Sequence, residues 1–376
     1  MHTDKNKKTN RNANPGRTRR KMMVFVAEIF VIIAMIGILV YVMKQTENEE
    51  ESGPIYASMD DVDPAQIGIS EETLKASEEG GAMAGYTNIA FFGVDALSEK
   101  NSDLLKGYRS DSIMIASINN ATGEVTLVSV YRDTYLNLGN DQYNKCNAAY
   151  AKGGATQAVT MLNANLDLNI TNWVTVSYKA LVTAVDDLGG IMIDVDSEEL
   201  IHLNNYQIAV AQALGIPESN IVPVKETGLQ RLNGMQAASY CRIRYTAGSD
   251  FVRTERQREV LKAMLEAAQG CDSSKLSDVF SDVMNYTYTS LDEKTFLDMI
   301  LHISDYHVIK EGGFPNMDML STANLPQKGD CVVPLDLTEN VAWLHEFLFD
   351  DTEYAPGRNV VTFSGQIGED TAAYIR

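Results

Sequence analysis

The stretch DSIMIASINNATGEVTLVSVYRD, residues 111–133, determines the fold that we expect for this chain. Two runs of apolar and β-branched residues flank the pentapeptide NNATG, residues 119–123, whose composition is typical of a turn. The pattern predicts two strands joined by a tight connection, with Arg132 and Asp133 directly after the second strand.

The segments on either side extend this pair of strands into an α/β domain. TNIAFFGVD, residues 87–95, is an apolar run that predicts a buried strand ending at Asp95. Further on, GGATQAVTMLNANLDL has helical periodicity, NWVTVSY predicts a strand, KALVTAVDDLGG a helix and IMIDV another strand. This β-α-β alternation predicts an α-β-α sandwich with a mixed central sheet.

The second half of the chain completes the predicted domain, residues 85–350. LNGMQAASY predicts a helix that leads into a strand, YCRIRY, and residues 250–269 predict a long helix capped by Ser249 or Asp250. CVVPLDL predicts one more strand and ENVAWLHEFLF a final helix. Residues 351–376 lack a strong pattern, and we expect them to form a loosely held tail.

The N-terminal residues predict a membrane anchor. Residues 1–21 hold eight Lys or Arg against one Asp, and residues 22–43 are apolar apart from Glu28. About 20 such residues span a bilayer as a helix, and the basic flank stays in the cytoplasm. No small-x-small cleavage site follows in YVMKQTENEE. We therefore expect a cytoplasmic tail, a transmembrane helix, an acidic extracellular stalk at residues 44–84 with a short helix near residues 70–77, and an extracellular domain.

Charge and cysteine content narrow the possible functions. The net charge is −20, and beyond Lys44 the chain holds 22 basic against 49 acidic residues. This balance argues against a nucleic-acid partner, which needs a basic surface. The spacing of the four cysteines fits no zinc motif. In an oxidising compartment we expect a disulfide between Cys146 and Cys241, and buried free thiols are the alternative.

Within this acidic chain, YCRIRYTAGSDFVRTERQREV, residues 240–260, contains five arginines and no lysine. A guanidinium group binds carboxylate or phosphate oxygens in pairs, so the choice indicates an anion with several oxygens. On the predicted strand, Arg242 and Arg244 share one face. Arg253 and Gln257 share a helical stripe, and Arg253 lies in the first turn, where a bound anion is favoured. The alternative is a solvated helix face with ion pairs, the role that we expect for Arg258.

Polar residues also recur at the ends of the predicted strands. Asp95 ends one strand, Arg109 and Asp111 precede the next, and Arg132 and Asp133 follow the third. Ligands of open α/β sheets bind at such edges. Asp95 and Asp111 suit a Mg²⁺ ion that bridges to phosphate oxygens. Together with the arginines, they predict a pyrophosphate site.

These motifs resemble those of the LytR-CpsA-Psr family of Gram-positive cell-envelope proteins. The matching segments lie in family order between about residues 88 and 265: GVD, RSDSIMIASIN, SVYRDTYL, NKCNAAYAKGG, AVDDLGGIMIDV, GLQRLNGMQAASYCRIRY and DFVRTERQ. The resemblance implies a Mg²⁺-dependent phosphotransferase. It would move an anionic glycopolymer, such as teichoic acid or capsule, from a polyprenyl-pyrophosphate carrier to a peptidoglycan sugar hydroxyl.

The resemblance also assigns residues to roles. Asp95 and Asp111 would associate with Mg²⁺, and Arg132 or Asp133 would lie nearest the reacting phosphorus or the acceptor hydroxyl. The residues implied around the pyrophosphate are Arg109, Arg132, Arg242, Arg244, Arg253 and Gln257. An apolar pocket would enclose the lipid tail. Tyr131 stands where the family often has proline, which changes the local backbone stiffness.

Two other functions fit the same residues. A non-catalytic polyprenyl-phosphate-binding or scaffold protein of the cell wall would use the arginines to hold its lipid. A pyrophosphate hydrolase would use water in place of the sugar hydroxyl. The sequence contains no Walker A loop, no Gly-x-Ser-x-Gly elbow and no zinc motif, so NTPase, serine hydrolase and metalloprotease activities lack support.

Overall fold

A mixed seven-stranded sheet organises the domain in the computed structural model, which describes residues 55–56, 62–94, 107–244 and 249–375. The strand order is β1-β10-β7-β2-β3-β4-β11. The strands are β1 (Ile55–Tyr56), β2 (Tyr86–Val94), β3 (Ser110–Asn119), β4 (Glu124–Val130), β7 (Asn172–Val176), β10 (Thr287–Thr289) and β11 (His307–Phe314). β3 and β4 form the predicted antiparallel pair, whereas β2 is antiparallel to β3 and parallel to β7. The prediction of an α/β fold with a mixed central sheet is confirmed.

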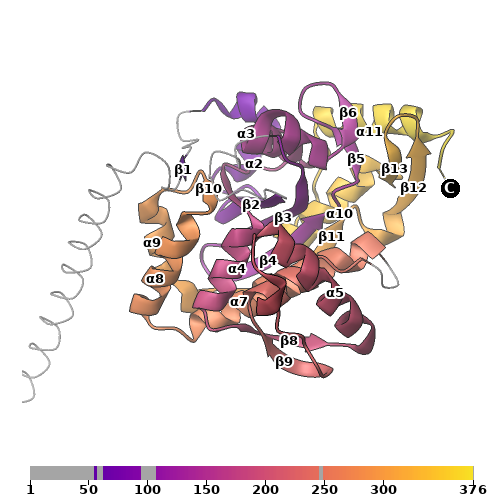
Figure 1. Cartoon of the computed structure of the whole chain (residues 1–376). Helices are drawn as coiled ribbons and strands as arrows, with labels where there is room; N and C mark the ends of the chain where they lie inside the picture. The colour runs from indigo at the N-terminus through magenta and orange to yellow at the C-terminus, as the bar shows by residue number, and fades with distance from the viewer. Residues whose placement is uncertain (1–54, 57–61, 95–106, 245–248, 376) are drawn as a thin grey trace, which may run out of the picture. The chain divides into compact units, whose positions relative to one another are not determined.

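Helices cover both faces of this sheet (Figure 1). On one face, α3 (Asn147–Leu166), α10 (Leu337–Phe349) and α11 (Arg358–Thr371) share an apolar core with strands β2, β3 and β4. On the other face, α7 (Ser249–Gln269) and α9 (Glu293–Leu301) pack on the alternate side chains of the same strands. The strictly alternating orientation of strand side chains explains why neighbouring residues such as Ile113 and Met114 belong to different cores.

A second group of elements packs against α7. It comprises α4 (Tyr178–Asp187), α5 (Ser197–Ala213), α6 (Gly234–Tyr240), β8 (Ile191–Val195) and β9 (Gly228–Leu232). The sequence predicted that β8 would extend the central sheet, and this was wrong, because β8 pairs with β9 in a separate antiparallel hairpin. Met192 is exposed while Ile191 and Ile193 are buried, so β8 has one solvated face, as is usual in antiparallel pairs. The predicted strand CVVPLDL likewise belongs to a separate hairpin of β12 (Leu320–Leu325) and β13 (Gly329–Pro334).

The predicted strand YCRIRY was also wrong. Helix α6 continues to Tyr240, and the amides of Arg242 and Ile243 then donate to the carbonyls of Ser239 and Tyr240, at 3.0 and 3.2 Å. These short-range bonds use the backbone donors that a sheet would need. Buried Ile243 anchors the segment in the core. The alternating segment YCRIRY therefore forms the end of a helix and a turn that Ile243 anchors.

The expected stalk and the expected C-terminal tail both contribute residues to the core of the domain. The predicted short helix is present as α2 (Glu71–Ser77), capped by Ser70, but Ile67, Ile69 and Met83 of the expected stalk are buried. In the expected tail, Val360 and Ile367 of α11 are buried. Residues 62–84 and 358–371 are thus integral to the domain.

The predicted transmembrane segment, residues 22–43, lies outside the described residues. Within the part of the chain that the structure describes, none of the helices has the length and apolar character needed to cross a membrane.

Candidate active site

Charged residues from four separate segments meet at one edge of the central sheet. Asp111 lies near the start of β3, Arg132 follows β4, Arg244 follows α6, and Asp250 and Arg253 lie in the first turns of α7. We call these five residues the arginine cluster. Arg132 Nη1 contacts Asp111 Oδ1 at 2.7 Å, and Arg244 Nη2 lies 3.6 Å from Asp111 Oδ2. Three guanidinium groups thus converge, as the sequence pattern suggested for a polyvalent anion.

Asp250 is the common partner of the three arginines. Its carboxylate oxygens lie 3.1 Å from Arg132 Nε, 3.4 Å from Arg244 Nε and 3.2 Å from Arg253 Nη1. A single carboxylate thus serves three guanidinium groups, through the kind of oxygen contact that arginine also makes to phosphates. The sequence suggested Asp250 only as a helix cap or an ion-pair partner.

Burial separates the arginines of the cluster. Arg253 has a side chain only 2% exposed, and its Nε has no hydrogen-bond partner among the described residues. Burial, together with nearby Arg244 and Arg132, lowers the pKa of Arg253 to about 10 despite the opposing effect of Asp250. Burial also acts to lower the pKa of Arg132, but Asp111, Asp250 and Asp133 outweigh it and raise that pKa above its ordinary value. Arg253 is therefore the cation of the cluster that would gain most from a further anion.

Asp133 connects the cluster to a lysine that the sequence did not single out. Asp133 Oδ1 lies 3.1 Å from Lys145 Nζ, and Oδ2 lies 3.5 Å from Arg132 Nε. The amide of Asn147 donates to the carbonyl of Arg132 at 3.1 Å, which ties the start of α3 to the same loop. A carboxylate between two cations still has free lone pairs, so it can accept a hydrogen bond from a hydroxyl group.

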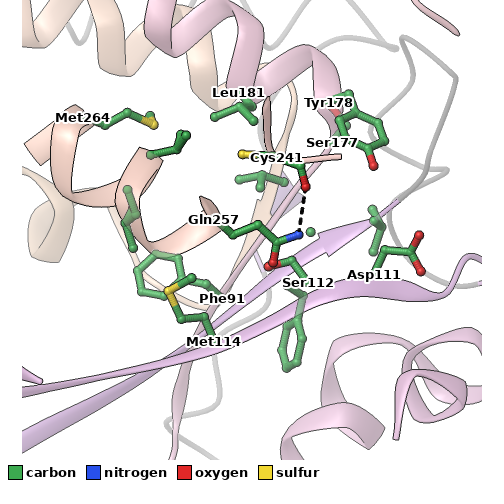
Figure 2. Close-up of a pocket in the computed structure, with 16 residues that line it drawn as sticks. Phe91, Asp111, Ser112, Met114, Ser177, Tyr178, Leu181, Cys241, Gln257 and Met264 are labelled. Carbon is green, nitrogen blue, oxygen red and sulfur yellow. Dashed lines mark hydrogen bonds between the residues drawn. The ribbon is translucent and has the colours of Figure 1, made fainter. Parts of the chain in front are cut away.

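An apolar cavity of about 140 Å³ opens next to the cluster (Figure 2). In Figure 2, Asp111 and Met264 lie at opposite ends of the residues that line the cavity. The side chain of Gln257 donates to the carbonyl of Cys241 at 3.5 Å. Other lining residues come from β2, β7, α4 and α7: Phe91, Phe92, Val94, Val176, Tyr178, Val260 and Leu261. The site thus combines a charged end with an apolar interior.

The other predicted site residues lie around this arrangement or outside it. Arg242 stacks on the ring of Tyr178, which lines the cavity, 4.8 Å from the ring centroid. Among the described residues, it forms no salt bridge with the cluster. Gln257 lines the cavity. Arg109 is exposed directly before β3. Asp95 lies outside the described residues, immediately after Val94, which also lines the cavity.

Arg258 corrects another expectation, because it is buried and not solvated. It is 6% exposed, and its Nη1 donates to Ser129 Oγ of β4 at 2.8 Å. The long helix α7 crosses the sheet, so the face that carries Arg258 meets β4 instead of solvent. Sequence spacing along one helix cannot reveal this contact, since Ser129 lies far away in the chain.

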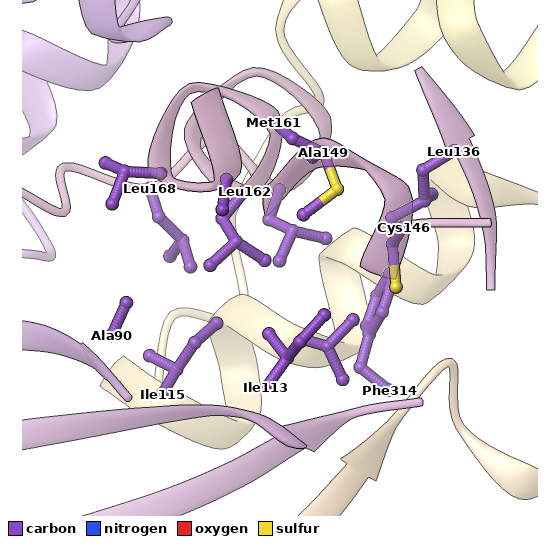
Figure 3. Packing of buried hydrophobic residues seen from close by; sticks show 14 of the residues in the cluster. Ala90, Ile113, Ile115, Leu136, Cys146, Ala149, Met161, Leu162, Leu168 and Phe314 are labelled. Carbon is purple, nitrogen blue, oxygen red and sulfur yellow. The ribbon is translucent and has the colours of Figure 1, made fainter. Parts of the chain in front are cut away.

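The predicted Cys146–Cys241 disulfide is absent, and all four cysteines are free thiols in the described structure. Cys146 points into the main core near Phe314 and Leu136 (Figure 3), and its thiol donates to the carbonyl of Tyr131 at 3.2 Å. Cys241 belongs to the other apolar group, beside α4, α5 and α7. Burial raises the pKa of both thiols, that of Cys241 to about 12, which keeps them protonated.

Asp250 and Lys145 are the site residues that sequence reasoning missed. Asp250 lies three residues before Arg253, a spacing at which helix side chains meet, and Lys145 falls within the quoted motif NKCNAAYAKGG. These two signals were available. Their convergence on Arg132 and Asp133 could not be predicted, because it depends on how three distant segments pack.

Comparison with known proteins places the chain in a family. Residues 40–323 match the model of the LytR_cpsA_psr family. Biofilm regulatory protein A of Streptococcus mutans is 31% identical over 214 residues, which cover 54% of this chain and 50% of that protein. The Bacillus subtilis polyisoprenyl-teichoic acid–peptidoglycan teichoic acid transferase TagT is 25% identical over 270 residues, which cover 71% of this chain and 77% of TagT. The match thus spans from half to about three quarters of these two relatives.

Solved structures share the fold. A Streptococcus agalactiae protein superposes with a TM-score of 0.58 at 25% identity, over 73% of this chain and 91% of that one. TagT with bound octaprenyl pyrophosphate gives a TM-score of 0.52 at 18% identity, over 74% of this chain and 94% of TagT. The family match covers most of the chain and agrees with the motifs and the mixed sheet, so this chain belongs to the LytR-CpsA-Psr family.

Proposed function

We propose that this protein is a membrane-anchored, extracellular phosphotransferase that moves an anionic glycopolymer from a polyprenyl-pyrophosphate carrier to a sugar hydroxyl of peptidoglycan. The observation that carries the proposal is the junction between the arginine cluster and the apolar cavity. Asp111 takes part in both, since it bonds to Arg132 and also lines the cavity. A ligand with a polyanionic head and an apolar tail fits this junction, and several relatives are named as teichoic acid transferases.

The cavity in this state is small for a long lipid. At about 140 Å³ it is close to the size of an engineered cavity that holds one benzene molecule. Its walls include the flexible side chains of Met114 and Met264, which adapt readily to a ligand. Binding of a polyprenyl chain would therefore require α4 and α7 to separate from the sheet.

We extend the proposal to Mg²⁺. The described residues contain no group of three or more side chains able to hold a metal by themselves. Mg²⁺ usually binds one or two carboxylates and completes its shell with water and substrate phosphates. The carboxylate of Asp111 within the cluster fits that mode, with Asp95 as its predicted partner. A bound Mg²⁺ would neutralise charge on the phosphate oxygens.

In the proposed reaction, this chain's own residues have the following roles. Arg132, Arg244 and Arg253 hold the pyrophosphate oxygens and stabilise the charge that develops on them. The acceptor hydroxyl attacks the phosphorus linked to the polymer, and the bond from this phosphorus to the polyprenyl phosphate breaks. Asp133 accepts the hydrogen bond of the attacking hydroxyl. The products are a polymer–peptidoglycan phosphodiester and polyprenyl phosphate, and the hydroxyl proton passes to the departing phosphate or to solvent.

A transfer assay tests the proposal. The full-length protein in detergent receives Mg²⁺, a lipid-pyrophosphate sugar donor and a peptidoglycan oligosaccharide, and mass spectrometry follows the products. We expect a phosphodiester-linked product that is lost in Arg132→Ala. It should persist in the matched control Arg358→Ala, which removes an exposed arginine at the start of α11.

The other outcomes separate the alternatives. Free sugar phosphate without a linked product would identify a pyrophosphate hydrolase. Donor that stays bound and unchanged would identify a carrier-binding protein. Either result would overturn the transferase proposal.

A further inference from the structure

A buried ion pair stands next to the arginine cluster without belonging to it. Arg256 of α7 is 3% exposed and Glu199 of α5 is 7% exposed. Arg256 Nε donates to Glu199 Oε1 at 2.7 Å. A buried ion pair seldom adds stability over apolar residues of similar volume, so its presence calls for a local reason.

The local reason is visible in the second contact of Arg256. Its Nη1 donates to the backbone carbonyl of Ile243 at 3.3 Å, and its guanidinium group lies over the ring of Tyr240, 5.8 Å from the centroid. Ile243 separates Arg242 from Arg244. Arg256 therefore holds the backbone of the segment from which two of the predicted phosphate-binding arginines project.

That segment bonds back to α6 through the amides of Arg242 and Ile243, and Arg256 adds a contact from a different helix. The segment follows the end of α6 and belongs to no strand, so no ladder of hydrogen bonds fixes its direction. The side chain of Arg244 is 36% exposed and reaches Asp250 and Asp111 at 3.4 and 3.6 Å. Both contacts depend on the direction in which the backbone at Ile243 presents Arg244.

Glu199 is itself fixed, so the support is rigid. It forms a capping box at the start of α5, in which Glu199 Oε2 accepts from the amide of Asp196 at 3.0 Å and Asp196 Oδ1 accepts from the amide of Glu199 at 2.7 Å. The connection runs from the start of α5 through Glu199 and Arg256 to Ile243. Arginine can serve two acceptors at fixed angles with Nε and Nη1, whereas lysine is a single point charge.

We propose that Arg256 is a positioning residue of the pyrophosphate site, which with Glu199 orients Arg244 through the backbone of Ile243. The inference rests on the proposed function, because it assumes that Arg244 binds the pyrophosphate. A purely structural ion pair would affect stability alone. A positioning residue acts on ligand affinity, and only while Arg244 is present.

A double-mutant cycle separates these roles. Isothermal titration calorimetry measures the affinity for farnesyl pyrophosphate in the presence of Mg²⁺. The proteins compared are the full-length wild type, Arg256→Lys, Arg244→Ala and the double variant. At metal sites, loss of a residue that orients a ligand-contacting group costs about 10–100-fold in affinity, and we expect a loss in this range for Arg256→Lys. In the Arg244→Ala background, Arg256→Lys should cause little further loss, since coupled residues are not additive.

Arg258→Lys is the matched control. Arg258 is equally buried on the same helix but donates to Ser129 of the sheet, so its substitution should lower the melting temperature and leave affinity unchanged. If Arg256→Lys does not fold, Glu199→Gln, which keeps the acceptor and removes the charge, takes its place in the cycle.

The outcomes distinguish the inference from the proposed function. If the wild type does not bind farnesyl pyrophosphate, the proposed function fails and the positioning role fails with it. If the wild type binds, equal losses in both backgrounds, or no loss at all, would overturn the positioning role alone.

Discussion

Asp250 offers the sharpest test of the arginine cluster, because one carboxylate there neutralises three guanidinium groups. The informative change is Asp250→Asn, which removes the charge and keeps the size of the side chain. Two consequences follow in opposite directions. The free protein loses stability, since Arg132, Arg244 and Arg253 then repel one another. The same protein gains affinity for pyrophosphate, since the competing anion is gone.

The magnitudes follow from burial and distance. Removing one partner of a fully buried pair costs about 3–5 kcal/mol, whereas an exposed pair contributes about 0.2–1 kcal/mol. Asp250 has a side chain 27% exposed, so we place the loss in unfolding free energy at about 2 kcal/mol, between these limits. For a domain of this size, this corresponds to a melting temperature lower by about 3 °C. A like charge about 4 Å from a bound phosphate costs about 1–4 kcal/mol, so about 2 kcal/mol of relief strengthens binding about 30-fold.

The assay is thermal unfolding of the full-length protein with increasing inorganic pyrophosphate, in EDTA so that no metal contributes. At about 100 times the dissociation constant, a ligand stabilises the folded state by about 2.7 kcal/mol, enough to offset the loss. Asp350→Asn is the control, because it removes an exposed carboxylate paired with Lys310 at 2.7 Å. If Asp250→Asn melts at the wild-type temperature, and pyrophosphate raises both melting temperatures equally, the role of Asp250 as an internal anion is refuted.

Two further predictions concern the cavity and the C-terminal helices. Val260→Phe places a ring into the apolar cavity, so we expect weaker binding of farnesyl pyrophosphate but unchanged binding of inorganic pyrophosphate. Calorimetry with both ligands measures the two affinities. An equal loss of affinity for both ligands would contradict the prediction. Asp336 caps α10 and accepts from Ser364 of α11, so Asp336→Ala should cost about 1–2 kcal/mol of unfolding free energy at neutral pH. Burial acts to raise the pKa of Asp336, but these hydrogen bonds outweigh it and lower that pKa below 3.8. The difference in unfolding free energy between wild type and variant should therefore persist above pH 3.8 and shrink as the pH falls through the pKa of Asp336 in the folded state. Denaturant titrations at several pH values measure this difference. A difference that does not change with pH would contradict the prediction.

The parts of the fold that were predicted correctly have local causes. The β3–β4 pair follows from alternating apolar residues around a turn, and α7 from a long periodic segment. The errors arose where a local pattern had a different tertiary partner. YCRIRY alternates like a strand, but its amides bond back to α6, and Arg258 occupies a helix face that meets Ser129 instead of solvent.

The same distinction applies to the candidate site. The residue types of the cluster were visible in the sequence, and the structure brings Asp111, Arg132, Arg244 and Arg253 together. The central position of Asp250 was not visible, because it depends on the packing of α7 against the segments that carry Arg132 and Arg244. Pairing between distant segments is a property of the fold.

The charge balance of the site explains why an acidic chain can carry such a cluster in a folded state. Convergent guanidinium groups in a half-buried site repel one another and lose hydration unless anions lie between them. In this structure Asp111 and Asp250 supply those anions, and the three arginines converge on them. Under the proposed function, a pyrophosphate would compete with these carboxylates for the arginines. A Mg²⁺ ion held by Asp111 would add positive charge to the site, which is a physical reason to expect a metal-dependent affinity even in a site that has three arginines of its own.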